Sequence, residues 1–150
     1  MPRLAVGTIQ LHYDLQGNGE PLLLIMGFGL SSASWRPEFL AGLARTFRVI
    51  TFDNRGTGRS DQPDNPVSIA LLADDAAALL DTLGIARAHV LGVSMGGSVA
   101  QEFALNHPQR LAGLVLGCAY CGDTFGIHLD RRYSVYARRV ASSTAAYSTT

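Results

Sequence analysis

The sequence Gly92-Val93-Ser94-Met95-Gly96-Gly97 decides the fold. It joins the apolar run Ala88–Val93, which predicts a buried strand, to residues 96–106, whose pattern predicts a helix that ends before Pro108. A G-x-S-x-G sequence at such a junction is typical of a sharp, strained turn that lifts the serine hydroxyl above the edge of the sheet. The following helix also offers free N–H groups and a positive dipole end to a developing oxyanion. Ser94 is therefore the candidate nucleophile.

Strand and helix patterns alternate along the chain on both sides of this turn. Short apolar runs bounded by turn residues are typical of strands that helices cover on both faces. The alternation predicts an α/β fold with a mostly parallel sheet of about six strands, flanked by helices. The predicted strands are Leu4–Val6, Thr8–Leu15, Pro21–Met26, Phe47–Phe52, Ala88–Val93 and Leu111–Cys118.

Two more helices are predicted before the Ser94 turn. The stretch that ends at Ala44 carries apolar residues at helical spacing, and Ser34 is its expected N-cap. The segment from Ile69 to Leu83 is the clearest helix in the chain. Ser68 stands at its N-cap position and Gly84 at its C-terminal cap position.

Length and composition indicate one domain and exclude several classes of protein. The chain has 150 residues and a formal net charge of zero, with no basic surplus that would indicate a nucleic acid or a membrane surface as partner. Its apolar runs are too short for a membrane helix, and its first residues lack the apolar core of a signal peptide. We expect a cytoplasmic protein with a small-molecule substrate, and the oligomeric state stays open.

A second turn supplies the other half of the predicted site. Acyl transfer needs two N–H donors for the oxyanion, one from the residue after the nucleophile and one from a loop after an earlier strand. Met95 and Phe28, within Gly27-Phe28-Gly29, meet these two requirements through their backbone. The side chains of Phe28, Leu30 and Met95 are expected to bind a small, largely apolar ester or lactone. An acyl-enzyme on Ser94 requires no metal and no organic cofactor.

The stretch from Glu20 to Cys118 resembles the N-terminal half of an α/β-hydrolase. The Gly-rich turn after a strand, the loop from Asp53 to Ser60, the Leu-rich helix and the Ser94 turn carry the resemblance. The Ser-Met-Gly-Gly form is similar to that of enol-lactone hydrolases, small bacterial esterases and cofactor-free haloperoxidases. Members usually have His before the first glycine of the oxyanion turn, where this chain has Met26. We expect Asp53 and Arg55 to fix their loop by hydrogen bonds rather than to contact the substrate.

The resemblance implies a catalytic acid and a histidine after Ser94. His107 follows a helix of about twelve residues, which places it ~18 Å from Ser94 and out of reach. Asp123 and His128 also follow Ser94, but members of the family place the histidine after a later strand. We therefore expect a truncated chain without the catalytic acid, the histidine, the lid or the last two strands. Such a chain would be weakly active, because Ser94 would lack a base.

The end of the chain departs from the alternating pattern. From Asp123 the apolar periodicity fades, and residues 141–150 are almost all Ala, Ser and Thr. We expect residues 1–122 to form the partial α/β-hydrolase core. Residues 123–150 would form a poorly packed tail or the start of a lid segment.

Two other functions fit parts of the sequence. A non-catalytic relative that keeps the pocket for ligand binding would also lack a base. A dinucleotide-binding domain would use Gly27-x-Gly29 and place Asp53 on a ribose. Against the second reading, Ser32 replaces the third glycine, and two strands precede the strand that should come first.

The remaining histidines and the two cysteines are expected to be structural. His12 and His89 precede Ser94 and lie on predicted strands. Cys118 and Cys121 have the C-x-x-C spacing of redox and metal sites, but no second pair accompanies them. We therefore expect ordinary thiols and satisfied or exposed imidazoles.

Overall fold

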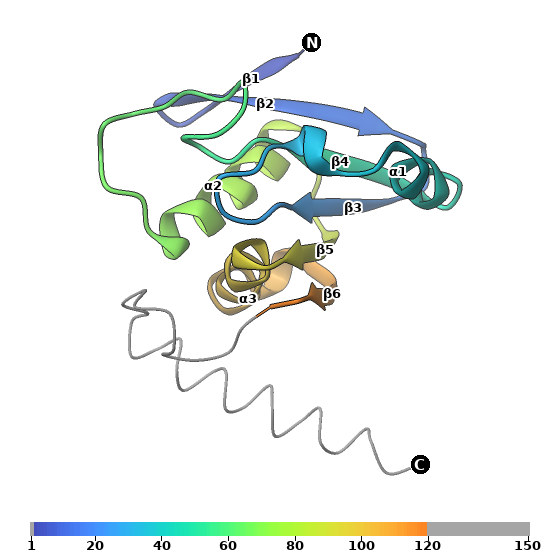
Figure 1. Cartoon of the computed structure of the whole chain (residues 1–150). Helices are drawn as coiled ribbons and strands as arrows, with labels where there is room; N and C mark the ends of the chain where they lie inside the picture. Colours follow the sequence, from blue (N-terminus) through green and yellow to red (C-terminus); the bar gives the residue numbers. More distant parts are fainter. Residues whose placement is uncertain (1, 120–150) are drawn as a thin grey trace. The chain divides into compact units, whose positions relative to one another are not determined.

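The computed structural model describes residues 2–119, which form a sheet flanked by helices (Figure 1). The α-helices and strands follow the predicted order, with boundaries that agree to within one residue except at the start of the first helix. In chain order the elements are β1 (Arg3–Val6), β2 (Ile9–Gln16), β3 (Glu20–Ile25), η1 (Ser32–Ser34), α1 (Pro37–Ala44), β4 (Phe47–Phe52), α2 (Ile69–Thr82), β5 (Ala88–Val93), α3 (Met95–Asn106), η2 (Pro108–Arg110) and β6 (Leu111–Gly117).

The six strands form one mixed sheet in the order β1-β2-β4-β3-β5-β6 (Figure 1). β3 pairs in parallel with β4 and β5, and β5 pairs in parallel with β6. β1 and β2 form an antiparallel hairpin, and β2 is also antiparallel to β4. The prediction of a mostly parallel sheet is confirmed. Because the carboxyl ends of parallel strands share one edge, the loops after β3, β4 and β5 meet there.

Helices cover both faces of the sheet, as the continuous apolar strands predicted. Leu22 and Leu24 of β3 point to one face, where they pack in a cluster with Leu40 of α1. Leu23 and Ile25 point to the other face, in the larger cluster that α2 and α3 complete. All four of these strand side chains are buried. The loops at the carboxyl edge therefore stand on a rigid core.

Sequence signals at both ends of α2 act as predicted. The Ser68 side chain accepts a hydrogen bond of 3.1 Å from the backbone N–H of Leu71, which satisfies one free donor of the first turn. Gly84 follows the helix with a φ of +68°, a conformation that glycine adopts without strain. Propensity and capping therefore define this helix locally.

The predicted N-cap of the first helix is wrong. Ser34 is the last residue of the short 3-10 helix η1, and α1 begins only at Pro37 with Arg36 at its N-cap. Proline is favoured in the first turn because its missing N–H would have no intrahelical partner there. Trp35 therefore lies between the two helices, where it stacks on Phe39 with ring centroids 5.7 Å apart.

The described residues contain no helix with both the length and the apolar character of a membrane span. The predicted tail or lid segment, residues 123–150, lies outside the described part of the chain. The predicted division of the chain after residue 122 therefore stays a prediction.

Candidate functional site

Ser94 is the single residue that connects β5 to α3, and its backbone conformation is strained. Its φ of 56° and ψ of −124° lie outside the regions that L-residues favour, at a cost of about 1–3 kcal/mol. Hydrogen bonds on both sides hold it there: its N–H donates to Gly117 O on β6 at 3.0 Å, and its carbonyl accepts from Gly97 N at 2.9 Å. The residue is exposed. The turn therefore presents the hydroxyl to solvent at the carboxyl edge of the sheet.

Two glycines make this turn possible by allowing backbones to approach closely. A Cβ atom at Gly92 would lie 2.1 Å from Gly96 O, and one at Gly96 would lie 2.1 Å from Ile25 O. Real Cβ atoms do not approach backbone atoms so closely. The start of α3 thus packs directly on the ends of β5 and β3.

The turn after β3 lies beside Ser94. A Cβ atom at Gly27 would be 3.2 Å from Ser94 Cβ and 3.6 Å from Ser94 Oγ. Leu30 N donates to Gly27 O at 3.3 Å, and Gly29 has a φ of +67°, as the third position of a type II turn requires. The structure therefore brings together the two turns that the sequence predicted to cooperate.

The three predicted substrate-contacting side chains differ in exposure. Phe28 is 83% exposed and Leu30 is 49% exposed, both large apolar side chains at the carboxyl edge. Met95 is partly buried and packs against the core that contains α2 and α3. It is the first residue of α3, where backbone N–H groups have no intrahelical acceptor. The side chains of Phe28 and Leu30 are thus available for apolar contacts.

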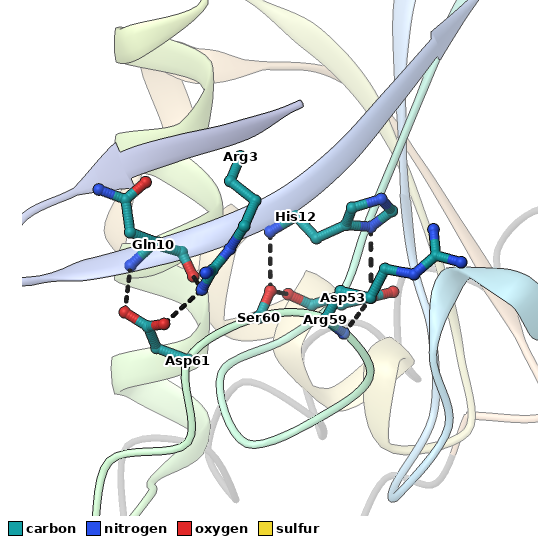
Figure 2. A network of polar contacts seen from close by, with 7 residues as sticks. All are labelled: Arg3, Gln10, His12, Asp53, Arg59, Ser60 and Asp61. Atoms are coloured by element: carbon teal, nitrogen blue, oxygen red, sulfur yellow. Dashed lines mark hydrogen bonds and ion pairs between the residues drawn. The ribbon is translucent and has the colours of Figure 1, made fainter. Parts of the chain in front are cut away.

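A polar network fixes the long loop after β4 to the first hairpin (Figure 2). Asp53 accepts hydrogen bonds from Ser32 N at 2.7 Å and Arg59 N at 2.8 Å. Ser60 Oγ donates to Asp53 O at 2.6 Å and accepts from His12 N at 2.9 Å. Asp53 is nearly fully buried, so these bonds form in a medium of low polarity. These hydrogen bonds therefore connect the start of the loop to β2 and to the segment after β3.

The carboxylate of Asp53 is held in its charged form. Burial raises the pKa of Asp53, but the hydrogen bonds from Arg59 and Ser32 outweigh burial, with a smaller contribution from His12. The pKa therefore lies below its ordinary value. Gly58 is needed beside this carboxylate, because a Cβ atom there would lie 2.2 Å from Asp53 Oδ2, and its φ is +53°.

Arg55 connects the same loop to α2. Its Nε and one terminal nitrogen donate to the two oxygens of Asp75 at 2.5 and 2.6 Å, a bidentate pair with both side chains largely buried. The same loop also contacts the first hairpin, where Asp61 accepts from Gln10 N of β2 at 2.8 Å and pairs with Arg3 of β1. The prediction that Asp53 and Arg55 fix their loop by hydrogen bonds agrees with this geometry.

The described histidines lie away from Ser94. His107 follows the last residue of α3 and its Nε2 is 2.8 Å from Asp74 Oδ1. His89 lies near the start of β5, at the opposite edge of the sheet, with its Nε2 3.0 Å from Glu20 Oε2. His12 lies on β2, three strand spacings or ~14 Å from β5 in the sheet. None of the three can serve Ser94 as a base.

His12 departs from the expectation of a satisfied or exposed imidazole. It is buried, and its Nδ1 lies 3.3 Å from Asp53 Oδ2 without hydrogen-bond geometry. Within residues 2–119 its Nε2 has no hydrogen-bond partner. Apolar and polar residues alternate over residues 9–14, and this pattern predicts that His12 faces solvent.

The other predicted positions are only partly described. Asp123, His128 and Cys121 lie outside the described residues. Cys118 is exposed with a φ of 50°, directly after β6. Residues 2–119 hold no group of three or more side chains suited to a metal ion.

Sequence reasoning did not single out Asn54. Its side chain is buried, and its Nδ2 donates to Met26 O at 3.3 Å. This carbonyl lies just before the turn of residues 27–30, the Phe28 turn. The available signal was its place directly after a buried strand, at the edge where the other loops meet.

Comparison with known proteins agrees with the resemblance seen in the sequence. A family model described as alpha/beta hydrolase fold matches residues 20–137. The chain is 43% identical over 122 residues to "Putative carbamate hydrolase RutD" of Caulobacter vibrioides, a match that covers 77% of this chain and 45% of that protein. It is 42% identical over 109 residues to "Putative non-heme bromoperoxidase BpoC" of Mycobacterium tuberculosis, covering 72% of this chain and 41% of that protein.

Solved structures show the same similarity. The enol-lactonase from Burkholderia xenovorans LB400 superposes with a TM-score of 0.72 at 37% identity, covering 75% of this chain and 45% of that chain. A thermophilic esterase from Thermogutta terrifontis superposes with a TM-score of 0.78 at 33% identity, covering 95% of this chain and 53% of that chain. The chain thus spans about half the length of the curated relatives it matches.

Proposed function

This chain belongs to the alpha/beta hydrolase fold family, and from that premise we propose that it is a serine hydrolase that forms an acyl-enzyme on Ser94. One observation carries the proposal. The turn that carries Phe28 and the turn that carries Ser94 lie against each other: a Cβ atom placed on Gly27 would lie 3.6 Å from Ser94 Oγ. A nucleophile and a Gly-rich turn from an earlier strand thus share one corner of the carboxyl edge, as acyl transfer requires.

In the proposed reaction, Ser94 Oγ attacks the carbonyl carbon of the substrate. Negative charge then develops on the carbonyl oxygen, where the backbone N–H groups of Phe28 and Met95 would donate hydrogen bonds. The positive end of the α3 dipole stabilises the same charge. Collapse of this intermediate expels the leaving group, which departs as the alcohol with the proton that Ser94 Oγ has lost, and the acyl group stays on Ser94. Water then hydrolyses the acyl-enzyme, which releases the carboxylic acid and restores the Ser94 hydroxyl.

A small ester or lactone is the proposed substrate class. Phe28 and Leu30 place exposed apolar surface beside the Ser94 turn, and such surface favours an apolar acyl group. The names of two structural relatives, an enol-lactonase and an esterase, indicate a lactone and an ester as the compounds on which those proteins act. The name of the carbamate hydrolase relative indicates a related carbonyl compound, so a carbamate is the second candidate. The predicted cytoplasmic location stays part of the proposal.

The Ser94 proton needs an acceptor, and the described histidines do not supply one. His107 binds Asp74 at the far end of α3, and His128, the other histidine after Ser94, lies outside the described residues. A site with a nucleophile and an oxyanion hole but no base retains only a residual acceleration, about 10³-fold over water. We therefore propose weak activity for this chain.

Hydrolysis of p-nitrophenyl acetate tests the proposal. We expect slow turnover, about 10³-fold above the uncatalysed rate, and a single acetyl group on Ser94 when the reaction is quenched and the peptides are analysed by mass spectrometry. Ser94→Ala should remove the acetyl group, and His128→Ala should leave the rate unchanged. Fast turnover that His128→Ala abolishes would show that His128 is the base. Absence of any acetyl group on Ser94 would favour a non-catalytic ligand-binding protein.

A further inference from the structure

We propose that Asn54 is a positioning residue for the turn that carries Phe28, an inference that rests on the proposed function. Asn54 follows β4, and its Nδ2 donates to Met26 O at 3.3 Å. Met26 directly precedes Gly27-Phe28, so its carbonyl sets the direction in which the chain enters the turn. No role was expected for Asn54 from the sequence, and it does not reach the substrate region itself, since it is buried.

The Met26 carbonyl is a contact point between the two turns of the proposed site. A Cβ atom at Gly96 would lie 2.7 Å from Met26 O, so this carbonyl packs against the first turn of α3. Met95, one residue before Gly96, and Phe28, two residues after Met26, would supply the two oxyanion donors. Asn54 therefore holds a carbonyl that packs against the start of α3 and directly precedes Gly27-Phe28.

The other end of the Phe28 segment is anchored by the neighbouring residue. Asp53 Oδ1 accepts from Ser32 N at 2.7 Å. Between these anchors the segment has few contacts, because Phe28 is 83% exposed and a Cβ atom at Gly29 would meet nothing within 4 Å. The position of the Phe28 N–H thus depends on its two ends, and adjacent residues of one loop hold both.

The burial of Asn54 indicates that its donor is needed. The residue is 2% exposed, and within residues 2–119 its Oδ1 has no hydrogen-bond partner. An unsatisfied buried polar atom destabilises the fold, and leucine of similar volume would avoid that cost. The carbonyl of Asn54 accepts from Thr57 N at 3.0 Å and from Thr57 Oγ1 at 2.9 Å, so the backbone bond remains when only the Thr57 hydroxyl is removed.

The test compares Asn54→Leu with Thr57→Val in the full chain. Asn54→Leu removes the hydrogen bond to Met26 O. Thr57→Val removes the hydrogen bond that the Thr57 hydroxyl donates to the carbonyl of Asn54 in the same loop. Asn54→Asp, nearly the same shape but without the donor, replaces Asn54→Leu if that variant does not fold. Two properties are measured: kcat and KM for p-nitrophenyl acetate, and hydrogen exchange of residues 27–32 by mass spectrometry.

We expect Asn54→Leu to lower kcat about 10- to 100-fold with KM nearly unchanged, because a displaced donor is lost chiefly from the transition state. Exchange of residues 27–32 should be faster in Asn54→Leu than in Thr57→Val, which should keep nearly the wild-type kcat. Equal kcat values in the two variants would overturn the inference and leave the proposed function standing. If the wild-type chain forms no acetyl-enzyme, the proposed function fails and the inference fails with it.

Discussion

Replacing Gly96 by alanine is expected to lower the free energy of unfolding by about 3 kcal/mol, the upper end of the usual cost of overpacking. The added Cβ atom would lie 2.1 Å from Ile25 O and 2.7 Å from Met26 O. Both are backbone atoms at the end of β3, a central strand of the sheet, and no rotamer change can relieve the overlap. The first turn of α3 would have to move away from β3 and carry Ser94 with it.

Gly42→Ala is the matched control for this substitution. Gly42 also lies in a helix, α1, and a Cβ atom there would meet nothing within 4 Å. Because alanine is the better helix former, we expect Gly42→Ala to raise the free energy of unfolding by about 0.5–1 kcal/mol. Urea denaturation measures both variants. Equal stability of Gly96→Ala and the wild-type chain would contradict the close packing of α3 on β3.

Asp53→Asn is expected to lower the free energy of unfolding by about 3 kcal/mol at neutral pH, because hydrogen bonds to a charged group contribute about 1.5–3 kcal/mol each. Asp53 accepts from Ser32 N and Arg59 N, and it faces His12 as well. Asparagine has one acceptor oxygen, so its NH₂ group would face a backbone N–H that also donates. The β4–α2 loop would then lose a principal contact with the segment after the Phe28 turn.

The loss of stability caused by Asp53→Asn should become smaller at acidic pH. The pKa of Asp53 is lowered in the folded chain, mainly by the hydrogen bonds that overcome the effect of burial. Its charged form therefore contributes fully above the unfolded pKa of about 4, and the contribution is lost as the pH falls through the folded pKa. The difference in unfolding free energy between wild type and Asp53→Asn should shrink below about pH 4.

Asp64→Asn provides the control for the pH series. Asp64 is exposed in the same loop, and a surface substitution of this kind is expected to change stability by no more than about 0.5 kcal/mol. Urea titrations at neutral pH and at several values below about pH 4 give the comparison. A cost of Asp53→Asn that stays constant over this range would show that the charge of Asp53 does not stabilise the fold.

The sheet and the helices could be predicted because local patterns determine them. The apolar runs at β3, β4 and β5 predicted strands covered on both faces, and the caps of α2 predicted both of its ends. The N-cap of α1 was mispredicted, because apolar spacing does not show where a 3-10 turn stops and a helix begins. Pro37 was the better signal for that boundary.

The site was only partly predictable for a different reason. Gly27 and Ser94 are far apart in the sequence, and their proximity was inferred because parallel strands share a carboxyl edge. The contact from Asn54 to Met26 and the burial of His12 against Asp53 depend on side-chain directions in a long loop. No periodicity governs the loop that carries Asp53 and Asn54, so the sequence places both residues after β4 but does not predict either contact.

A crystal structure of the chain after reaction with a fluorophosphonate would show whether Ser94 is the nucleophile and where the oxyanion donors lie. We expect a covalent bond from Ser94 Oγ to phosphorus, with one phosphonyl oxygen about 2.7–3.1 Å from both Phe28 N and Met95 N. Ser94→Ala should remain unmodified under the same conditions. An unmodified Ser94 in the wild-type chain, or a phosphonyl oxygen that points to solvent away from both N–H groups, would contradict this expectation.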